Sequence, residues 1–269
     1  MAERAIAERL LYRIVKRHIA GTTMSSAIEK AKELNDKKLP VSIAFLSENA
    51  RDSTKARYAT TTYLELIRRI ARLGLKASIQ VPLDQVGYDI SDEVAEKNVN
   101  DIINTAKTYG VFVWLEIRDH RYTLPGFLHE AKGVGYAVSV DHSDDYIEAN
   151  RGNIRALKIL CTEAHGEGKE AGKRISGRVK NASRMVKNAV VQSAPDTAVR
   201  ELLNGANVKK SLIFEFQLGY NSKKMSRVVK KGARASVYVP FGKDWEHYAV
   251  SRTPERYARF LATRILKEA

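Results

Sequence analysis

The run Leu212-Ile213-Phe214-Glu215-Phe216-Gln217 decides how this chain folds, because it is largely apolar and ends on an amide. Strands that are apolar almost throughout are typical of a parallel sheet covered on both faces. A second run of this kind, Val237-Tyr238-Val239-Pro240-Phe241-Gly242, follows it and closes in a turn. We therefore expect two buried strands that place polar groups at or near their ends.

A helix is predicted after these strands, beginning at Thr253-Pro254-Glu255. Its apolar stripe carries Tyr257, Leu261 and Ile265, and arginines 252, 256 and 259 form another stripe. A polar cluster at strand ends that faces an arginine-bearing helix suits an anionic small molecule, because guanidinium groups bind carboxylates and phosphates well.

Similar apolar runs precede these two, which gives eight predicted strands: residues 41–46, 77–82, 111–117, 135–140, 154–160, 189–194, 212–217 and 235–241. Helical patterns lie between them, most clearly at 58–73, 91–109, 196–203 and 221–231, and less clearly at 124–131 and 143–150. Strand and helix alternating eight times over roughly 250 residues predicts an α/β fold, a (β/α)8 TIM-type barrel.

We expect a single domain over residues 1–269, with N-terminal helices at 1–39, the barrel at 40–252 and a terminal helix at 253–269 over the barrel mouth. A doubly wound open sheet is the alternative, since a number of strands does not establish closure. No Gly-x-Gly-x-x-Gly follows the first predicted strand, which argues against a dinucleotide crevice there.

The composition is strongly basic: 46 Lys and Arg against 31 Asp and Glu give a net charge of +15. Such a surface attracts nucleic acid, anionic lipid or acidic ligands without choosing among them. Cys161 is the only cysteine, which excludes an internal disulfide and favours a reducing compartment. No apolar run approaches the ~20 residues of a membrane span. We expect a cytoplasmic protein, with peripheral contact to the inner face of the membrane as a further option.

In barrel enzymes the chemistry lies at the C-terminal ends of the strands. Three weaker possibilities involve residues near those ends. Asp141, His142 and Glu116 could form a carboxylate-rich metal site, and Cys161 with His165 could form a nucleophile and base. The glycine-rich segment 162–174 could hold a phosphate on its backbone amides. No P-loop or nucleophile elbow is present.

Five motifs, in chain order, resemble the proline dehydrogenase family, which are flavoenzymes on a (βα)8 barrel that oxidise proline to pyrroline-5-carboxylate. Phe214-Glu215-Phe216-Gln217 matches the family's strand-seven motif, and residues 237–245 are close to Val-Tyr-Val-Pro-Tyr-Gly-x-x-Trp. Residues 17–23 resemble Arg-Phe-Val-Ala-Gly-Glu-Thr, and residues 112–119 follow Phe-Val-Arg-Ile-Asp-Met-Glu-Asp. Residues 154–158 parallel Val-Arg-Leu-Val-Lys.

The resemblance implies a site for substrate and one for FAD. In the substrate pocket, Tyr238 packs against the ring, Arg252 holds the carboxylate and Glu255 orients Arg252, while Gln80 and Glu116 occupy the family's strand-two Lys and strand-three Asp positions. The residues that it places against the flavin are Arg155, Lys158, Gln217, Ser139 and Ser193.

The departures from the family fall on functional positions. Ser251 replaces the first of two arginines before the terminal helix, and Gln80 replaces a lysine, so two cations of the substrate pocket are lost. Ser139 stands for a glutamine, Ser193-Ala194 for Thr-His and Ile159 for a glycine, all beside the cofactor. This pattern indicates a relative with another substrate, or one that has lost the chemistry.

Two functions therefore stay open. The first is an FAD-dependent oxidoreductase of proline catabolism, or of a related cyclic amine or amino acid, that passes electrons to a quinone or another acceptor. The second is a barrel without flavin whose basic stretches, residues 169–187 and 223–234, bind nucleic acid or a phosphorylated ligand. Few aromatic residues interleave with those cations, so base stacking has little support. A different barrel enzyme is a third possibility.

Overall fold

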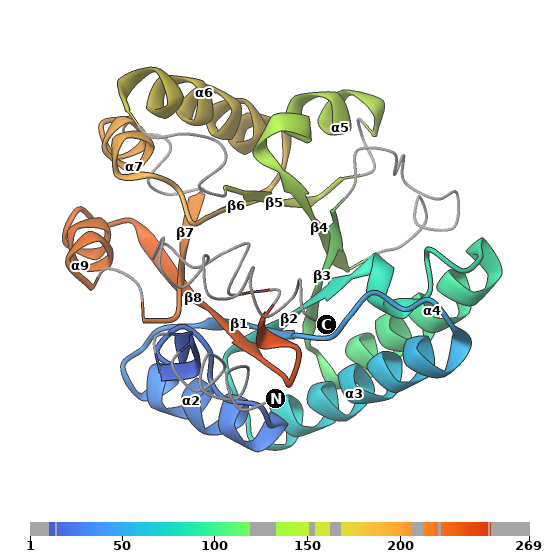
Figure 1. The fold of residues 1–269 in the computed structure, drawn as a ribbon. Coiled ribbons are helices and arrows are strands. Elements are labelled where there is room, and N and C mark those ends of the chain that lie inside the picture. The colour runs from blue at the N-terminus through green and yellow to red at the C-terminus, as the bar shows by residue number, and fades with distance from the viewer. Residues whose placement is uncertain are drawn as a thin grey trace.

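The protein forms a closed barrel of eight parallel strands, in chain order, in a computed structural model (Figure 1). The structure describes residues 11–13, 15–118, 133–150, 154–161, 168–205, 212–219, 222–246 and 248. The strands are β1 Val41–Phe45, β2 Ala77–Pro82, β3 Phe112–Ile117, β4 Val134–Ser139, β5 Ala156–Leu160, β6 Asn188–Gln192, β7 Leu212–Gln217 and β8 Arg234–Phe241. The barrel prediction is confirmed, and the open sheet is wrong because β8 pairs with β1.

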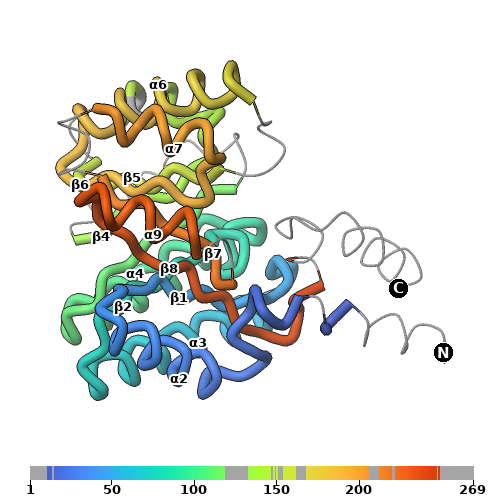
Figure 2. The backbone as a smooth tube through the Cα atoms, turned by 90° about the vertical axis from the view of Figure 1, so that its left-hand side faces the viewer, coloured from blue at the N-terminus to red at the C-terminus, as the bar shows by residue number. Residues whose placement is uncertain are grey.

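Helices cover the outside of the barrel (Figures 1 and 2). They are α2 Met24–Asp36, α3 Ser53–Arg72, α4 Asp92–Tyr109, α5 Ser143–Ala149, α6 Lys169–Met185, α7 Asp196–Leu203 and α9 Ser222–Lys230, with short 3-10 turns η1 Leu83–Val86 and η3 Val140–His142. Helix α3 begins earlier than predicted because the Asp52 carboxylate accepts a hydrogen bond from the Lys55 amide and caps the first turn.

Helix α6 is not among the predicted helices, because its sequence is mostly polar and its buried face is narrow. That face includes Gly172, Ile175, Val179 and Ala182. A Cβ on Gly172 would lie 2.6 Å from the Thr197 side chain, so glycine allows α6 to approach α7 closely. Part of the segment interpreted as a phosphate-holding loop is therefore helix, and residues 162–167 of it lie outside the described residues.

The main hydrophobic core lies between the strands and the helices. The outward side chains of the strands, such as Ile43, Ile79, Ile159 and Phe214, are buried there against helical residues such as Leu66. The core is continuous around the barrel. Because inward and outward positions alternate along a strand, this shell leaves every second residue for the interior of the barrel.

Two smaller apolar clusters limit the interior. Trp114, Ala156 and Val190 pack with Phe112 and Ile213 near the N-terminal ends of the strands. Near the C-terminal ends, Tyr238 and Trp245 are buried against Leu11, Val15 and Ile19 of the N-terminal segment. A polar layer lies between these two clusters.

The N-terminal segment is fixed to the C-terminal ends of β7 and β8. The Ala20 amide donates to the Pro240 carbonyl at 2.8 Å. His18 Nδ1 lies 3.0 Å from the Leu218 carbonyl oxygen, so that nitrogen carries the proton. Gly219 has φ of +72°, and a Cβ there would lie 2.1 Å from the Arg17 carbonyl oxygen. Glycine is therefore required where this segment crosses the strand end.

No helix within the described part of the chain is long and apolar enough to cross a bilayer.

Candidate active site

A charged side chain occupies the middle of the barrel. Lys158 is fully buried, and its ammonium donates to Ser42 Oγ at 2.9 Å, Gln80 Oε1 at 2.8 Å and Glu215 Oε2 at 2.8 Å. The Trp114 ring lies beneath it, 4.9 Å from ammonium to ring centre. All three ammonium protons are used, which is what a buried Lys requires.

The hydrogen bonds continue from Lys158 in both directions. Gln192 Nε2 donates to Glu215 Oε2 at 2.7 Å, and Gln80 Nε2 donates to Glu116 Oε2 at 2.7 Å. Ser236 Oγ lies 3.4 Å from the other Glu215 oxygen. We call these side chains the interior network: Ser42, Gln80, Glu116, Lys158, Gln192, Glu215 and Ser236. Burial lowers the pKa of Lys158, while the adjacent Glu215 carboxylate acts in the opposite direction.

Arg118 extends this network to the end of β3. Its Nε donates to Glu116 Oε1 at 3.1 Å, and its Nη1 donates to Asp84 Oδ2 at 3.2 Å. Burial disfavours the guanidinium charge, but Glu116 and Asp84 together raise the pKa of Arg118 above its usual value. Burial raises the pKa of the Asp84 carboxyl, and Arg118 opposes that shift.

Tyr63 joins the same region from α3. Its hydroxyl donates to Gln85 Oε1 at 2.7 Å, and Gln85 Nε2 donates to the Ser47 carbonyl at 3.0 Å. Burial raises the pKa of Tyr63. The charge of Arg118 lowers this pKa, whereas Tyr238, Glu116 and Asp84 raise it further. The groups at the ends of β2 and β3 therefore share one electrostatic environment with β8.

Tyr238 and Gln217 are direct neighbours across β7 and β8. Both side chains are buried, and Tyr238 packs near Tyr248 with ring centres 6.5 Å apart. Ser193 directly follows β6, with φ of 58°, and its amide donates to the Glu215 carbonyl at 3.0 Å. Ser139 ends β4, where its hydroxyl accepts from the Asp141 amide at 3.4 Å.

Closure of the barrel thus brings Gln80, Glu116 and Lys158 into one network, and it places Gln217, Ser193, Ser139 and Tyr238 at or near the C-terminal ends of their strands. Arg155 does not join them: it is exposed and precedes Ala156, the first residue of β5, at the opposite end of the barrel. This position does not fit the flavin contact that the resemblance gave it. Arg252 and Glu255 lie outside the described residues.

The resemblance gave no role to several members of the observed cluster. Asp84, Arg118, Gln192 and Glu215 are polar residues at or near predicted strand ends, whereas Ser42 and Ser236 were not singled out. The available signal was a charged residue inside an apolar strand, as with Glu215 in Leu212–Gln217. A buried charge needs a partner, and β5 with its Lys158 was the strand that could supply one.

The alternatives for this region find little support. Asp141 forms ion pairs with Arg174 and Arg178, whereas Glu116 is held by Gln80 and Arg118. No group of three His, Cys, Asp or Glu residues suited to a metal occurs within the described ranges. Cys161 is buried, and His165 lies outside those ranges.

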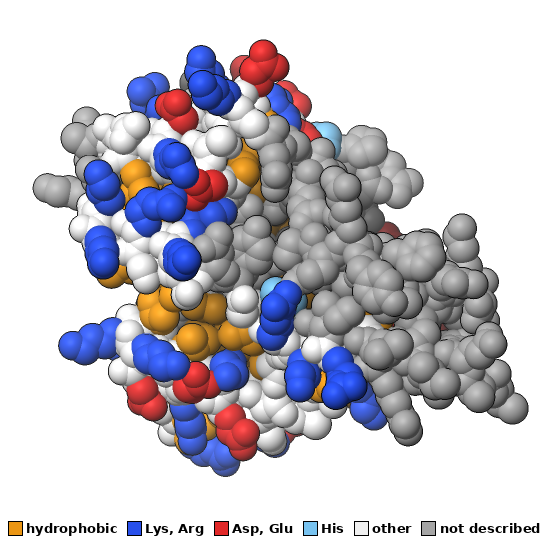
Figure 3. All heavy atoms as spheres, turned by 60° about the vertical axis from the view of Figure 1, so that its left-hand side comes forward, with side chains coloured by type: hydrophobic (Ala, Val, Ile, Leu, Met, Phe, Trp, Pro, Cys, Tyr) orange, Lys and Arg blue, Asp and Glu red, His pale blue; other side chains and the backbone are white. Residues whose placement is uncertain are grey.

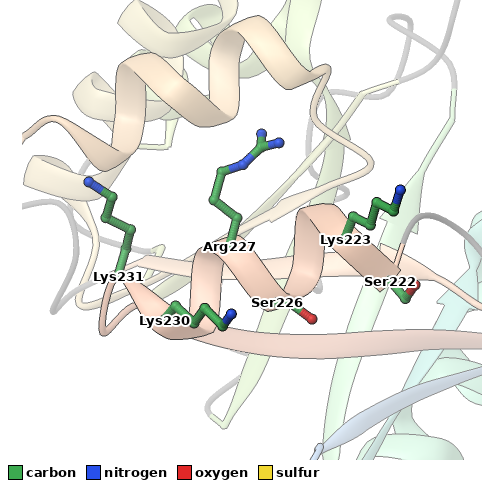
Figure 4. Close-up of a pocket in the computed structure, with 6 residues that line it drawn as sticks. All are labelled: Ser222, Lys223, Ser226, Arg227, Lys230 and Lys231. Atoms are coloured by element: carbon green, nitrogen blue, oxygen red, sulfur yellow. The ribbon is translucent and has the colours of Figure 1, made fainter.

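A separate groove of about 480 Å³ lies on the outer surface of α9. Lys223, Arg227 and Lys231 extend from one side of the helix, and Ser222, Ser226 and Lys230 lie on the other (Figure 4). Lys and Arg side chains are scattered over the described part of the face seen in Figure 3, with fewer Asp and Glu among them. Arg227 is paired with Asp196 at 2.7 Å, so part of this charge is neutralised.

A closed (β/α)8 barrel with charged and amide groups gathered at the C-terminal strand ends is the architecture of a barrel enzyme. Comparison with known proteins specifies the relationship further. The chain is 26% identical to proline dehydrogenase 1 of Bacillus subtilis (strain 168), with 94% of this chain and 91% of the relative covered. It is 25% identical to the proline dehydrogenase of Deinococcus radiodurans, with 99% and 96% covered.

Solved structures agree on the fold. Proline utilization A from Bdellovibrio bacteriovorus, inactivated by N-propargylglycine, superposes with a TM-score of 0.69 at 15% identity over 95% of this chain. The chain spans only 32% of the length of that structure. No family model matches the chain. The resemblance predicted from the motifs is confirmed: the chain is similar to curated proline dehydrogenases over most of its length.

Proposed function

We propose that this protein is an FAD-dependent oxidoreductase that oxidises proline, or a related cyclic amine or amino acid, at the carbon next to the ring nitrogen. The observation that carries the proposal is the pairing of Tyr238 with Gln217 at the barrel mouth, within motifs similar to those of proline dehydrogenases. Oxidation removes a hydride from that carbon and a proton from the nitrogen, which leaves a carbon–nitrogen double bond.

The residues near the ends of β6 and β7 fit a polar cofactor. Ser193 Oγ is buried with no hydrogen-bond partner, and the Gln217 amide makes no hydrogen bond to any described residue. A buried polar atom without a partner costs about 1–3 kcal/mol, so a ligand that bonds to Ser193 Oγ would recover that free energy, and the Gln217 amide is available to the same ligand. These two groups are the ones that we expect to hold the edge of the flavin ring. When bound, FAD would supply the hydride acceptor.

The side chains of the pocket then have separate roles. Tyr238 provides an aromatic wall against the substrate ring, and its position is fixed by packing against the N-terminal segment. Glu116 holds Arg118 and Gln80 in place at the end of the barrel. Arg252 would bind the substrate carboxylate, and Glu255 would orient Arg252. Lys158 would lie beneath the cofactor. Ser139 would approach the cofactor from β4.

The electrons would pass to a quinone or another acceptor. We propose a cytoplasmic protein that meets a membrane-bound acceptor at the inner face of the membrane. Its net charge of +15 would favour such peripheral contact with anionic lipid.

Two measurements test the function. The purified protein should show the yellow absorbance of a flavin, or acquire it on titration with FAD, and should then reduce an artificial dye when L-proline is added. Gln217→Ala should weaken FAD binding about tenfold, whereas Gln192→Ala, deeper in the barrel, should act mainly on stability. A colourless protein that binds no FAD would contradict the proposal.

The alternative, a flavin-free basic binding module, has one observation in its favour, the groove on α9. It predicts binding to a labelled single-stranded RNA that falls steeply between low and physiological salt. Substitution of Lys223 and Lys231 by Gln should then abolish that binding. Salt-insensitive or absent RNA binding in a flavin-loaded protein would exclude it.

A further inference from the structure

Arg118 differs from the other charged residues of the site in its exposure. Its side chain is 38% exposed, whereas Glu116 is 1% and Asp84 is 6% exposed. Lys158 and Glu215 are buried deeper, at 0% and 3%. Burial disfavours the charge of Arg118, but part of its side chain still reaches solvent, and two buried carboxylates orient the guanidinium before any ligand arrives.

The hydrogen bonds of Arg118 leave part of its guanidinium available. An arginine carries five N–H donors. One N–H on Nε goes to Glu116 and one on Nη1 goes to Asp84, and Arg118 makes no further hydrogen bond among the described residues. Three N–H groups therefore remain, including both on Nη2. Two parallel N–H groups on one edge of a guanidinium match the two oxygens of a carboxylate.

The sequence around Arg118 also favours a role in binding. The similar family motif has Glu at this position, so the local charge is reversed. Gln80 and Ser251 replace two cations that the resemblance places in the substrate pocket. Arg118 contacts Glu116, which in turn accepts a hydrogen bond from Gln80. A cation therefore stands beside the position from which a lysine was lost.

We propose that Arg118 forms a carboxylate-binding subsite at the barrel mouth and selects amino-acid over simple amine substrates. Glu116 and Asp84 fix two sides of the guanidinium, and its open edge receives the substrate carboxylate. The role of this subsite during turnover rests on the proposed function.

If Arg118 had only a structural role, it would connect β3 to η1 through Glu116 and Asp84 and would not contact the substrate. The two roles differ in how a variant treats two substrates. Loss of a structural connection would disturb the pocket for every substrate. Loss of a carboxylate contact would affect only the substrates that carry a carboxylate. L-proline and pyrrolidine differ by that carboxylate alone, so they form the required pair.

The experiment uses the FAD-loaded protein and the variant Arg118→Gln, with Arg72→Gln on the exposed end of α3 as control. Arg118→Gln should raise KM for L-proline roughly tenfold to a hundredfold, since it removes a charge-assisted hydrogen bond. Its kcat for L-proline and its KM for pyrrolidine should change less than threefold. An equal rise in KM for both substrates, or no rise for L-proline, would overturn the proposal.

A binding measurement keeps the subsite testable without turnover. Cyclopentanecarboxylate has the ring and the carboxylate but no nitrogen to oxidise. Calorimetry should show that it binds the wild-type protein, that Arg118→Gln lowers its affinity at least tenfold and that Arg118→Lys retains part of it. Cyclopentylmethanol should bind equally weakly to all three. Binding of this kind in a protein that does not oxidise proline would support the subsite while the proposed function fails.

Equal affinity of cyclopentanecarboxylate for wild type and Arg118→Gln would refute the subsite, whatever the protein oxidises. Thermal melts of each variant check folding. If Arg118→Gln does not fold, the comparison of Arg118→Lys with wild type decides, because a monodentate ammonium should still weaken carboxylate binding severalfold.

Discussion

The two faces of the same strands follow different chemistry. Ile159 points outward into a continuous apolar core, while its neighbour Lys158 points inward to Ser42, Gln80 and Glu215. The outward face resembles the core of any soluble barrel. The inward face carries charges that pair only because the barrel closes. The outward face therefore determines that the chain folds as a barrel, and the inward face determines what the barrel can bind.

The two faces also differ in how they tolerate change. An apolar core accepts side chains of similar volume with small losses. A buried ion pair does not, because removal of one partner leaves an uncompensated charge. Substitutions on the two faces should therefore differ in size and in their dependence on pH.

The largest effect is expected for Lys158→Met. It leaves the Glu215 carboxylate buried without its ammonium partner, so the free energy of unfolding should fall by about 3–5 kcal/mol. Urea denaturation at neutral pH measures this loss. The double variant Lys158→Met with Glu215→Leu removes both charges and should recover more than half of it. A loss below about 1 kcal/mol in the single variant would show that the interior is well hydrated.

A smaller effect is expected for the neighbouring residue Ile159, which lies on the outward face. Ile159→Val removes one methylene from the fully buried core and should cost about 0.5–1.5 kcal/mol. The loss should be the same at pH 5.5 and pH 8, because no titrating group changes its surroundings. A pH-dependent loss would contradict the separation of the two faces.

A third variant tests the segment that crosses the mouth. His18 is buried, donates to the Leu218 carbonyl and accepts from Arg17 Nε at 3.0 Å. Burial lowers the pKa of His18, so its neutral form stabilises the fold above the unfolded pKa of 6.5 and this stability is lost as the pH falls below that value. His18→Phe should cost about 1 kcal/mol at pH 7.5, for the lost hydrogen bond.

The difference between His18→Phe and wild type should shrink between pH 6.5 and pH 5, because only the wild type has an imidazole to protonate. Urea denaturation across this range provides the measurement. A constant difference would mean that His18 does not titrate in that interval and that another group controls the pH response.

Much of the fold was predictable because the outward face repeats a simple pattern. The strands β2 and β7 match their predicted ranges, since each is a largely apolar run that begins directly after a polar residue, Lys76 or Ser211. Helix α6 was missed because Gly172 and a narrow apolar stripe weaken its pattern. The start of α3 depended on a side-chain cap at Asp52, which apolar spacing does not reveal.

The site was less predictable because it depends on distances across the barrel. Motif likeness placed Tyr238, Gln217 and Lys158 near the site, but it could not give the contact between Lys158 and Ser42, which are on strands far apart in the sequence. Arg155 lies before the first residue of β5 and apart from this cluster, and the motif alone does not say where β5 begins. Arg118 lay at a strand end, but its two carboxylate partners emerge only from the structure.

The most direct test of this account is the response of the FAD-loaded protein to L-proline without oxygen. If the inward face binds flavin and a cyclic amino acid together, the visible flavin absorbance should bleach on addition of L-proline and return with an artificial acceptor. A flavin that stays fully oxidised with proline, pyrrolidine and related cyclic amines alike would contradict this account. It would show that the barrel has the fold of the proline dehydrogenases without their oxidation chemistry.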